Sequence, residues 1–187
     1  MNSSGFQDVD YVLTTREIGK MIKQAGIEFT KLEDEEMDSP LGLSSGAADI
    51  FANTGGVMEA ALRTVYEVVT GRQLPVENLH LQPIAGLEGI KEAALTIENP
   101  LEEYSFLDGV EVKTAVAHGL ENASRLIEKI VSGEKEYHFA EVMTCPGGCI
   151  GGGGQPRFTD NEVRTKRIQA IYTEDEGTKL RKSHENP

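Results

Sequence analysis

One stretch of sixteen residues, 141–156, constrains this chain more than any other. It contains both cysteines of the protein and six of its twenty glycines. A glycine run gives up side-chain packing and loses the most backbone entropy on folding. It is therefore expected where the backbone approaches another group closely or adopts a positive φ angle. Two thiols among such glycines indicate a group that is bound through sulfur.

The residues leave three interpretations of this stretch open. Cys145 and Cys149 are separated by Pro-Gly-Gly, which lets the chain fold both sulfurs towards one point. Thiolates are soft ligands that select iron–sulfur, zinc or cuprous sites, although two of them do not complete a four-coordinate site. A phosphate-binding loop is disfavoured because the Lys-Ser/Thr ending of a P-loop is missing. The third interpretation is a redox or nucleophilic cysteine with His118 or His138 as its base.

Length and charge narrow the classes of protein to which the chain can belong. Its 187 residues suffice for one sizeable domain, and we expect residues 1–187 to form a single lobe with a polar tail from about residue 173. The net charge of −13 argues against a nucleic-acid partner. The sequence has no apolar run near the roughly 18 residues that a membrane span requires. Because no signal peptide is visible either, a cytoplasmic location is expected.

The first half of the chain predicts a strand over residues 9–15 and then a helix whose capping box is formed by Thr14 and Glu17. Gly26 is placed to end this helix, and the acidic residues 31–40 are expected to form a solvated loop. A loop of small residues, 41–56, leads into a second helix that ends at Gly71. The face expected to pack on a sheet consists of the small side chains Val57, Ala60, Ala61, Thr64 and Val68.

The second half is richer in strand patterns. We expect strands over residues 79–85, 90–97, 110–117 and 138–143, with a helix over residues 120–131. The buried face of that helix is predicted to comprise Leu120, Ala123, Ile127, Ile130 and Val131. A last helix follows Pro156, with Thr159 and Glu162 at capping-box spacing. The pattern predicts an α/β fold with a mixed or mainly parallel sheet flanked by helices, and a glycine-rich loop at the carboxyl end of a strand.

The segment Met-Thr-Cys-Pro-Gly-Gly-Cys-Ile-Gly-Gly-Gly-Gly-Gln-Pro, residues 143–156, resembles the last signature motif of the iron-only (FeFe) hydrogenases, M-x-C-x-x-G-C-x-x-G-G-G-Q-P. Residues 45–63 and 8–17 are similar to segments that this family carries upstream. The resemblance extends over essentially the whole chain. It implies that the chain forms one lobe of the hydrogenase catalytic domain, which binds the H-cluster, a 4Fe–4S cubane joined to a di-iron subsite.

The resemblance also implies roles for individual residues. Cys145 corresponds to a ligand of the cubane, and Cys149 to the thiolate that ligates the cubane and bridges to the di-iron subsite. Met143 corresponds to a side chain close to the di-iron unit, and Phe51 to an aromatic wall of its pocket. Four further positions are expected to line the cofactor: Thr54, Gly55, Gly147 and Gly148. Ala52 stands where glycine is more usual in the family.

Two other motifs of the family have no counterpart in this sequence. They carry two more cubane cysteines, a proton-transferring cysteine and a lysine, and the family places them N-terminal to the segment seen here. The chain is therefore expected to be a fragment or one half of a split protein, inactive by itself and partnered by the N-terminal half of the domain. The complete protein is expected to interconvert H₂ with protons and to exchange electrons with ferredoxin or with NAD(P)-linked flavin and iron–sulfur subunits. A noncatalytic iron–sulfur relative, either sensory or an assembly factor, is the alternative.

Overall fold

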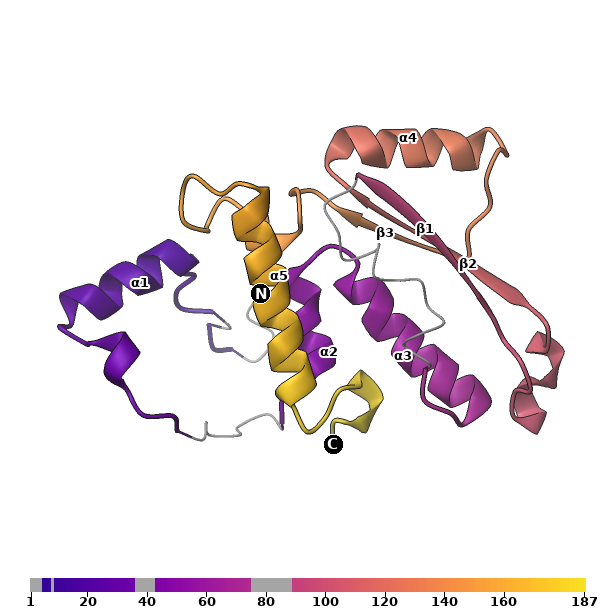
Figure 1. Ribbon diagram of the computed structural model, residues 1–187, viewed down its shortest axis with the longest axis horizontal. Coiled ribbons are helices and arrows are strands. Elements are labelled where there is room, and N and C mark those ends of the chain that lie inside the picture. Colours follow the sequence, from indigo (N-terminus) through magenta and orange to yellow (C-terminus); the bar gives the residue numbers. More distant parts are fainter. Residues whose placement is uncertain (1–4, 8, 36–42, 75–88) are drawn as a thin grey trace. The chain divides into compact units, whose positions relative to one another are not determined.

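The computed structural model describes residues 5–7, 9–35, 43–74 and 89–187, which fall into two compact units (Figure 1). Unit 1 comprises Met1–Asp38 and Gly153–Thr159, and unit 2 comprises Ser39–Gly152 and Asp160–Pro187. The glycine run of the sequence thus contributes to both units. None of the helices that the structure describes is both long and apolar enough to cross a bilayer.

In unit 1, helix α1 spans Thr15–Gln24 and a 3₁₀ turn spans Phe29–Lys31. The predicted capping box is confirmed, because the Thr14 Oγ1 accepts from the Glu17 amide at 3.3 Å and the Glu17 carboxylate accepts from the Thr14 amide at 2.7 Å. Gly26 follows the helix with a φ of +73°. The predicted strand over residues 9–15 is wrong: its described residues precede the helix as irregular chain, and Thr15 already belongs to α1. A β-branched pattern needs a neighbouring strand, and none of the described strands lies against it.

Unit 2 contains a mixed sheet whose described strands are β1 (Ile90–Thr96), β2 (Glu111–His118) and β3 (Phe139–Met143). Strands β1 and β2 are antiparallel, with Ile90 opposite Ala117, whereas β2 and β3 are parallel, with Thr114 opposite Phe139. These three strands and the mixed α/β class agree with the sequence prediction. The strand expected over residues 79–85 lies outside the described residues.

Two helices cover opposite faces of this sheet: α4 (Leu120–Val131) on one side and α3 (Gly56–Thr70) on the other (Figure 1). Because side chains alternate along a strand, Val116 of β2 packs with α3 while its neighbours Ala115 and Ala117 pack with Leu126 of α4. The α3 side of the core is formed by Met58, Leu62, Tyr66 and Val69. A 3₁₀ segment at Glu102–Leu107 connects β1 and β2.

The extents of α3 and α4 were predicted correctly, but the faces that they bury were predicted only in part: Ala60 and Ala123 are buried as expected. The residues of α3 that face the sheet are Met58, Leu62, Tyr66 and Val69. Val68, which belongs to the predicted small face, is 43% exposed. In α4 the buried residues are Ala123 and Leu126, whereas Leu120, Ile127, Ile130 and Val131 are exposed. Both helices carry apolar residues on more than one side, so periodicity alone does not select the side that meets the sheet.

The remaining elements of unit 2 are α2 (Gly46–Asp49) with a 3₁₀ turn at Ile50–Ala52, a 3₁₀ turn at Cys149–Gly151, α5 (Asn161–Gly177) and a 3₁₀ turn at Ser183–Glu185. Residues 46–52 are therefore helical rather than a loop. Asp160, not Thr159, caps α5 by accepting from the Val163 amide at 2.9 Å. The tail expected from residue 173 is also not a separate polar segment, because α5 continues through it and Asp175 is completely buried.

Truncation of Leu126 to alanine is expected to destabilise the protein by about 2–5 kcal/mol, because this side chain is 1% exposed beneath the sheet. The matched control is Ile127→Ala in the same helix, where the side chain is 54% exposed and the change should stay within about 0.5 kcal/mol. Denaturant unfolding of both variants measures the difference. Equal losses at the two positions would contradict the assigned face of α4.

Candidate metal centre

The candidate site lies where the parallel strands β2 and β3 end. Their last residues, His118 and Met143, are paired in register, and the Gly119 amide donates to the Met143 carbonyl at 2.8 Å. The carboxyl ends of neighbouring parallel strands are where α/β sheets present ligand sites. The chain leaves β3 at this edge and enters residues 144–152, which we call the cysteine loop.

The cysteine loop begins with a tight turn. The Gly148 amide donates to the Cys145 carbonyl at 3.0 Å, with Pro146 and Gly147 between them. Gly147 has a φ of +82°, so proline precedes a left-handed glycine as a type II turn requires. The 3₁₀ turn at Cys149–Gly151 follows, closed by a 3.0 Å hydrogen bond from the Gly152 amide to the Cys149 carbonyl. Cys145 is partly exposed and Cys149 is exposed, and both are free thiols.

A second backbone segment, residues 52–55, packs directly against this turn. The Thr54 amide donates to the Gly147 carbonyl at 3.1 Å. A Cβ atom on Gly148 would lie 2.8 Å from the Thr54 nitrogen and 2.9 Å from the Ala52 carbonyl oxygen. The close approach expected of the glycine run therefore occurs at Gly148, where backbone meets backbone.

His118 holds the other side of the turn. Its Nδ1 accepts a hydrogen bond of 2.7 Å from the Gly147 amide, and both residues are buried. His138 accepts from the Lys113 amide through its own Nδ1 at 3.0 Å, just before β3 and so at the end of that strand remote from the cysteine loop. In both histidines Nδ1 is a backbone acceptor, which favours a structural role over that of a base for a catalytic cysteine.

Glu141, in the middle of β3, connects the sheet to the start of α3. Its carboxylate accepts from the Gly55 amide at 2.6 Å and from the Met58 amide at 2.7 Å, and the residue is 6% exposed. It thereby satisfies two of the free amides at the N-terminus of that helix. Burial raises the pKa of Glu141, and the two hydrogen bonds oppose that shift. The role of Glu141 was not predicted from the sequence, although an acidic residue inside an apolar strand was the available signal.

The structure brings some of the predicted site residues together. Thr54 and Gly148 are buried and in direct contact, and Gly147 joins them through the hydrogen bond from Thr54. Gly55 is attached to β3 through Glu141. Met143 is half-buried at the end of β3, and Phe51 is 45% exposed. The role of Phe51 stays a prediction.

The donor atoms suit part of a cluster site. Across the residues that the structure describes, no group of three or more His, Cys, Asp or Glu side chains could hold a metal ion. The two accessible thiols in a glycine turn are the soft ligands that iron–sulfur centres use. They fit a cluster whose other ligands come from elsewhere.

Comparison with known families decides the identity of the chain. Residues 1–153 match the family described as the iron-only hydrogenase large subunit, C-terminal domain. The chain belongs to this hydrogenase family. Residues 161–187, which comprise α5 and the chain after it, match a second family, described as the iron hydrogenase small subunit.

Individual relatives agree with this assignment. The chain is 48% identical over 185 residues to the NADP-reducing hydrogenase subunit HndD of Solidesulfovibrio fructosivorans, covering 98% of this chain and 29% of that protein. A solved structure of the FeFe-hydrogenase HydA1 from Chlamydomonas reinhardtii is 44% identical, with a TM-score of 0.73, covering 96% of this chain and 49% of the other. The cytosolic iron-sulfur assembly component 3 of Mus musculus is 31% identical over 172 residues, covering 89% of this chain and 34% of that protein. The chain thus spans about a third of these curated relatives.

Substitution of Gly148 by alanine is expected to destabilise the protein by about 1–3 kcal/mol, because the added Cβ meets backbone atoms that cannot rotate away. A φ of +85° adds strain for any L side chain. Gly153→Ala is the matched control, since nothing lies within 4 Å of its added Cβ. Thermal unfolding measures both, and an unchanged midpoint in Gly148→Ala would contradict the packing of residues 52–54 on the loop.

Glu141→Gln is expected to change how stability depends on pH. A carboxyl whose folded pKa is raised stabilises the fold most below its ordinary value of 4.5, and this contribution is lost as pH rises through the folded pKa. Glutamine does not titrate, so the stability of the wild-type protein relative to the variant should fall from pH 4.5 upward. Urea unfolding at a series of pH values tests this, with Glu128→Gln on exposed α4 surface as the control.

Proposed function

We propose that this chain is part of an iron-only hydrogenase that catalyses the reversible oxidation of H₂ to protons and electrons. The observation that supports this most directly is the pair of thiols, Cys145 and Cys149, in a glycine turn at the carboxyl end of the sheet. Membership of the hydrogenase family supports it independently. When bound, the H-cluster would supply the electron transfer and the H₂ chemistry.

The residues of this chain would hold and enclose that group. Cys145 and Cys149 would hold the cubane through their thiolates, and Cys149 would also hold the di-iron subsite. Met143 and Phe51 are proposed to flank the di-iron side and to exclude water from it. Thiolate donors need fixed directions, and the surrounding residues orient metal ligands as much as the ligands themselves do.

The segment that faces the loop is proposed to line the cofactor through Thr54, Gly55, Gly147 and Gly148. The Thr54 hydroxyl supports this, because it is buried and has no hydrogen-bond partner among the residues described. A buried polar group without a partner requires an explanation, and a ligand or a further part of the protein at this place supplies one.

The remaining ligands and the proton-delivery groups are proposed to come from the N-terminal half of the same domain. The coverage of only 29% of the HndD relative supports this, as does the lack of a third metal ligand near the thiols in the described part of the chain. Similarity to HndD, an NADP-reducing hydrogenase subunit, supports an NADP-linked electron partner, and ferredoxin is the other candidate.

The test is H₂ evolution with a reduced viologen as electron donor, after maturation with the iron–sulfur and di-iron assembly proteins. The chain alone should evolve no H₂, whereas the chain joined to the N-terminal half of a hydrogenase large subunit should. Cys149→Ser in the joined protein should abolish evolution and lower the iron content. The neighbouring Thr144→Ser, at an exposed position, should change neither.

A noncatalytic iron–sulfur protein is the second candidate. It is favoured by the 31% identity to the cytosolic iron-sulfur assembly component 3. The same experiment separates the two functions: iron bound through both cysteines without any H₂ evolution in the joined protein would support this second candidate and contradict the first.

A further inference from the structure

Helix α5 contacts the elements that form the back of the candidate site. Its half-buried residues Ile171 and Tyr172 pack on a small core formed by Ala47 of α2, Ile50 of the next 3₁₀ turn and Ala60 of α3. Its first half contacts the 3₁₀ turn at Cys149–Gly151. One helix thus touches both the cysteine loop and the helices against which that loop folds.

Arg167 makes the contact with the cysteine loop. Its Nη1 donates to the Ile150 carbonyl at 2.6 Å, one residue after Cys149. Ile150 is itself 4% exposed, so this carbonyl lies in a partly desolvated environment where a charged donor is effective. The loop is tight at this point, since a Cβ on Gly151 would lie 2.2 Å from the Pro146 carbonyl oxygen.

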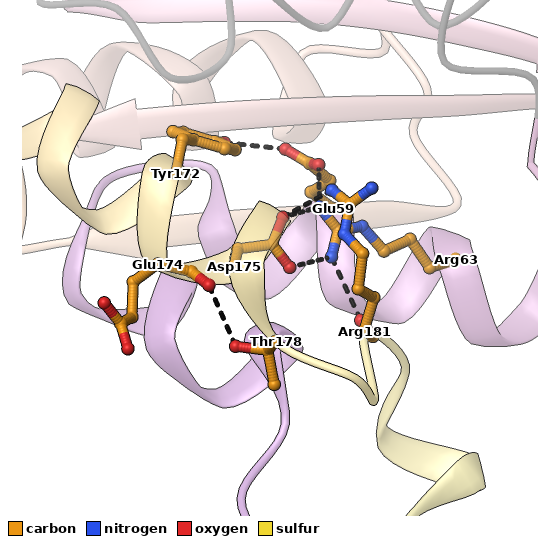
Figure 2. Close-up of polar contacts among 7 residues, drawn as sticks. All are labelled: Glu59, Arg63, Tyr172, Glu174, Asp175, Thr178 and Arg181. Atoms are coloured by element: carbon orange, nitrogen blue, oxygen red, sulfur yellow. Dashed lines mark hydrogen bonds and ion pairs between the residues drawn. The ribbon is translucent and has the colours of Figure 1, made fainter.

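The other end of α5 is fixed by a buried ion pair. Figure 2 shows Asp175 between Arg63 of α3 and Arg181, with its carboxylate accepting from Arg63 Nη1 at 2.7 Å and Nη2 at 2.9 Å. Arg181 adds a third hydrogen bond of 2.5 Å. Burial disfavours the charge of this fully enclosed carboxylate, but the hydrogen bonds from Arg63 and Arg181 outweigh that effect and lower the pKa of Asp175.

The same cluster connects α5 to α3 by a second path. Tyr172 donates to the Glu59 carboxylate at 2.6 Å, and Glu59 accepts from Arg63 Nη2 at 2.6 Å (Figure 2). Gly46 of α2 lies against Asp175, where a Cβ would be 2.1 Å from Oδ1. The position of α5 along α3 is therefore determined by directed contacts as well as by apolar packing.

We propose that α5 positions the cysteine loop from behind, with Arg167 as the positioning residue and the Asp175–Arg63 pair as its anchor. A helix is rigid over the eight-residue step from Arg167 to Asp175, a rise of about 12 Å, so anchoring one end fixes the other. Restraint of the Ile150 carbonyl then limits the directions available to the Cys149 thiol. The inference rests on the proposed function, because it takes this loop to carry metal ligands.

The test is amide hydrogen exchange of the whole metal-free chain. Arg167→Gln should raise exchange in residues 148–152 about tenfold or more, the effect of losing one hydrogen bond to a charged group, with the sheet unchanged. Arg167→Lys, which keeps one charged donor, should restore part of the protection. Lys166→Gln is the matched control. Lys166 is the residue before Arg167, and its side chain is exposed and pairs with Glu162 on the same helix.

Asp175→Asn extends the test to the anchor. It should raise exchange in α5 and in residues 148–152 together, and if this variant does not fold, the Arg167 variants decide alone. Loop exchange in Arg167→Gln equal to that of the wild type, or a uniform rise that includes β1 to β3, would overturn the proposal. Because no metal is present, a negative result here is distinguishable from a failure of the joined protein to evolve H₂.

Discussion

The carboxylate of Glu141 makes the interaction on which the rest of the site depends. From the middle of β3 it reaches the first amides of α3, so the strand that delivers the cysteines and the helix that covers the sheet are fixed to each other. Residues 52–55 are the direct lead into that helix, and they form the surface on which Gly148 lies. A shift of α3 along the sheet would therefore displace the floor of the cysteine loop. The buried charge is costly by itself, and two amide donors at a helix N-terminus offset part of that cost.

Local signals in the sequence predicted the elements well. Thr14 and Glu17 specified the start of α1 through a capping box, and Gly71 specified the end of α3 with a φ of +67°. The strands around Ile90, Glu111 and Phe139 followed from alternation, whereas the sequence left a mixed and a mainly parallel sheet both open. The predicted place of the cysteine loop after a strand is confirmed, and its turn was predictable because proline and glycine dictate the local geometry.

Long-range contacts were not predictable in the same way. Asp175 was assigned to a polar tail because its partner Arg63 lies far away in the sequence, and a buried ion pair leaves no periodic signal. His118 was considered as a base because the hydrogen bond that its Nδ1 accepts from the Gly147 amide depends on strand register, which the sequence does not reveal. Val68 was misassigned and Leu126 was missed because α3 and α4 have apolar residues on several sides, and tertiary packing selects among them.

The far end of the glycine motif has a different consequence, which concerns the order of folding. In unit 1 the Arg16 amide donates to the Gly154 carbonyl at 3.2 Å, and Gln155 donates to Thr15 Oγ1 at 3.3 Å. These contacts join the first helix of the chain to a segment that follows β3, so nearly everything in unit 2 before α5 lies inside the loop that they close. Closing so long a loop carries an entropic cost that grows with its length, and it is compensated only when the intervening chain is already compact. We therefore expect α1 to form these contacts late in folding, after the sheet and the cysteine loop of unit 2.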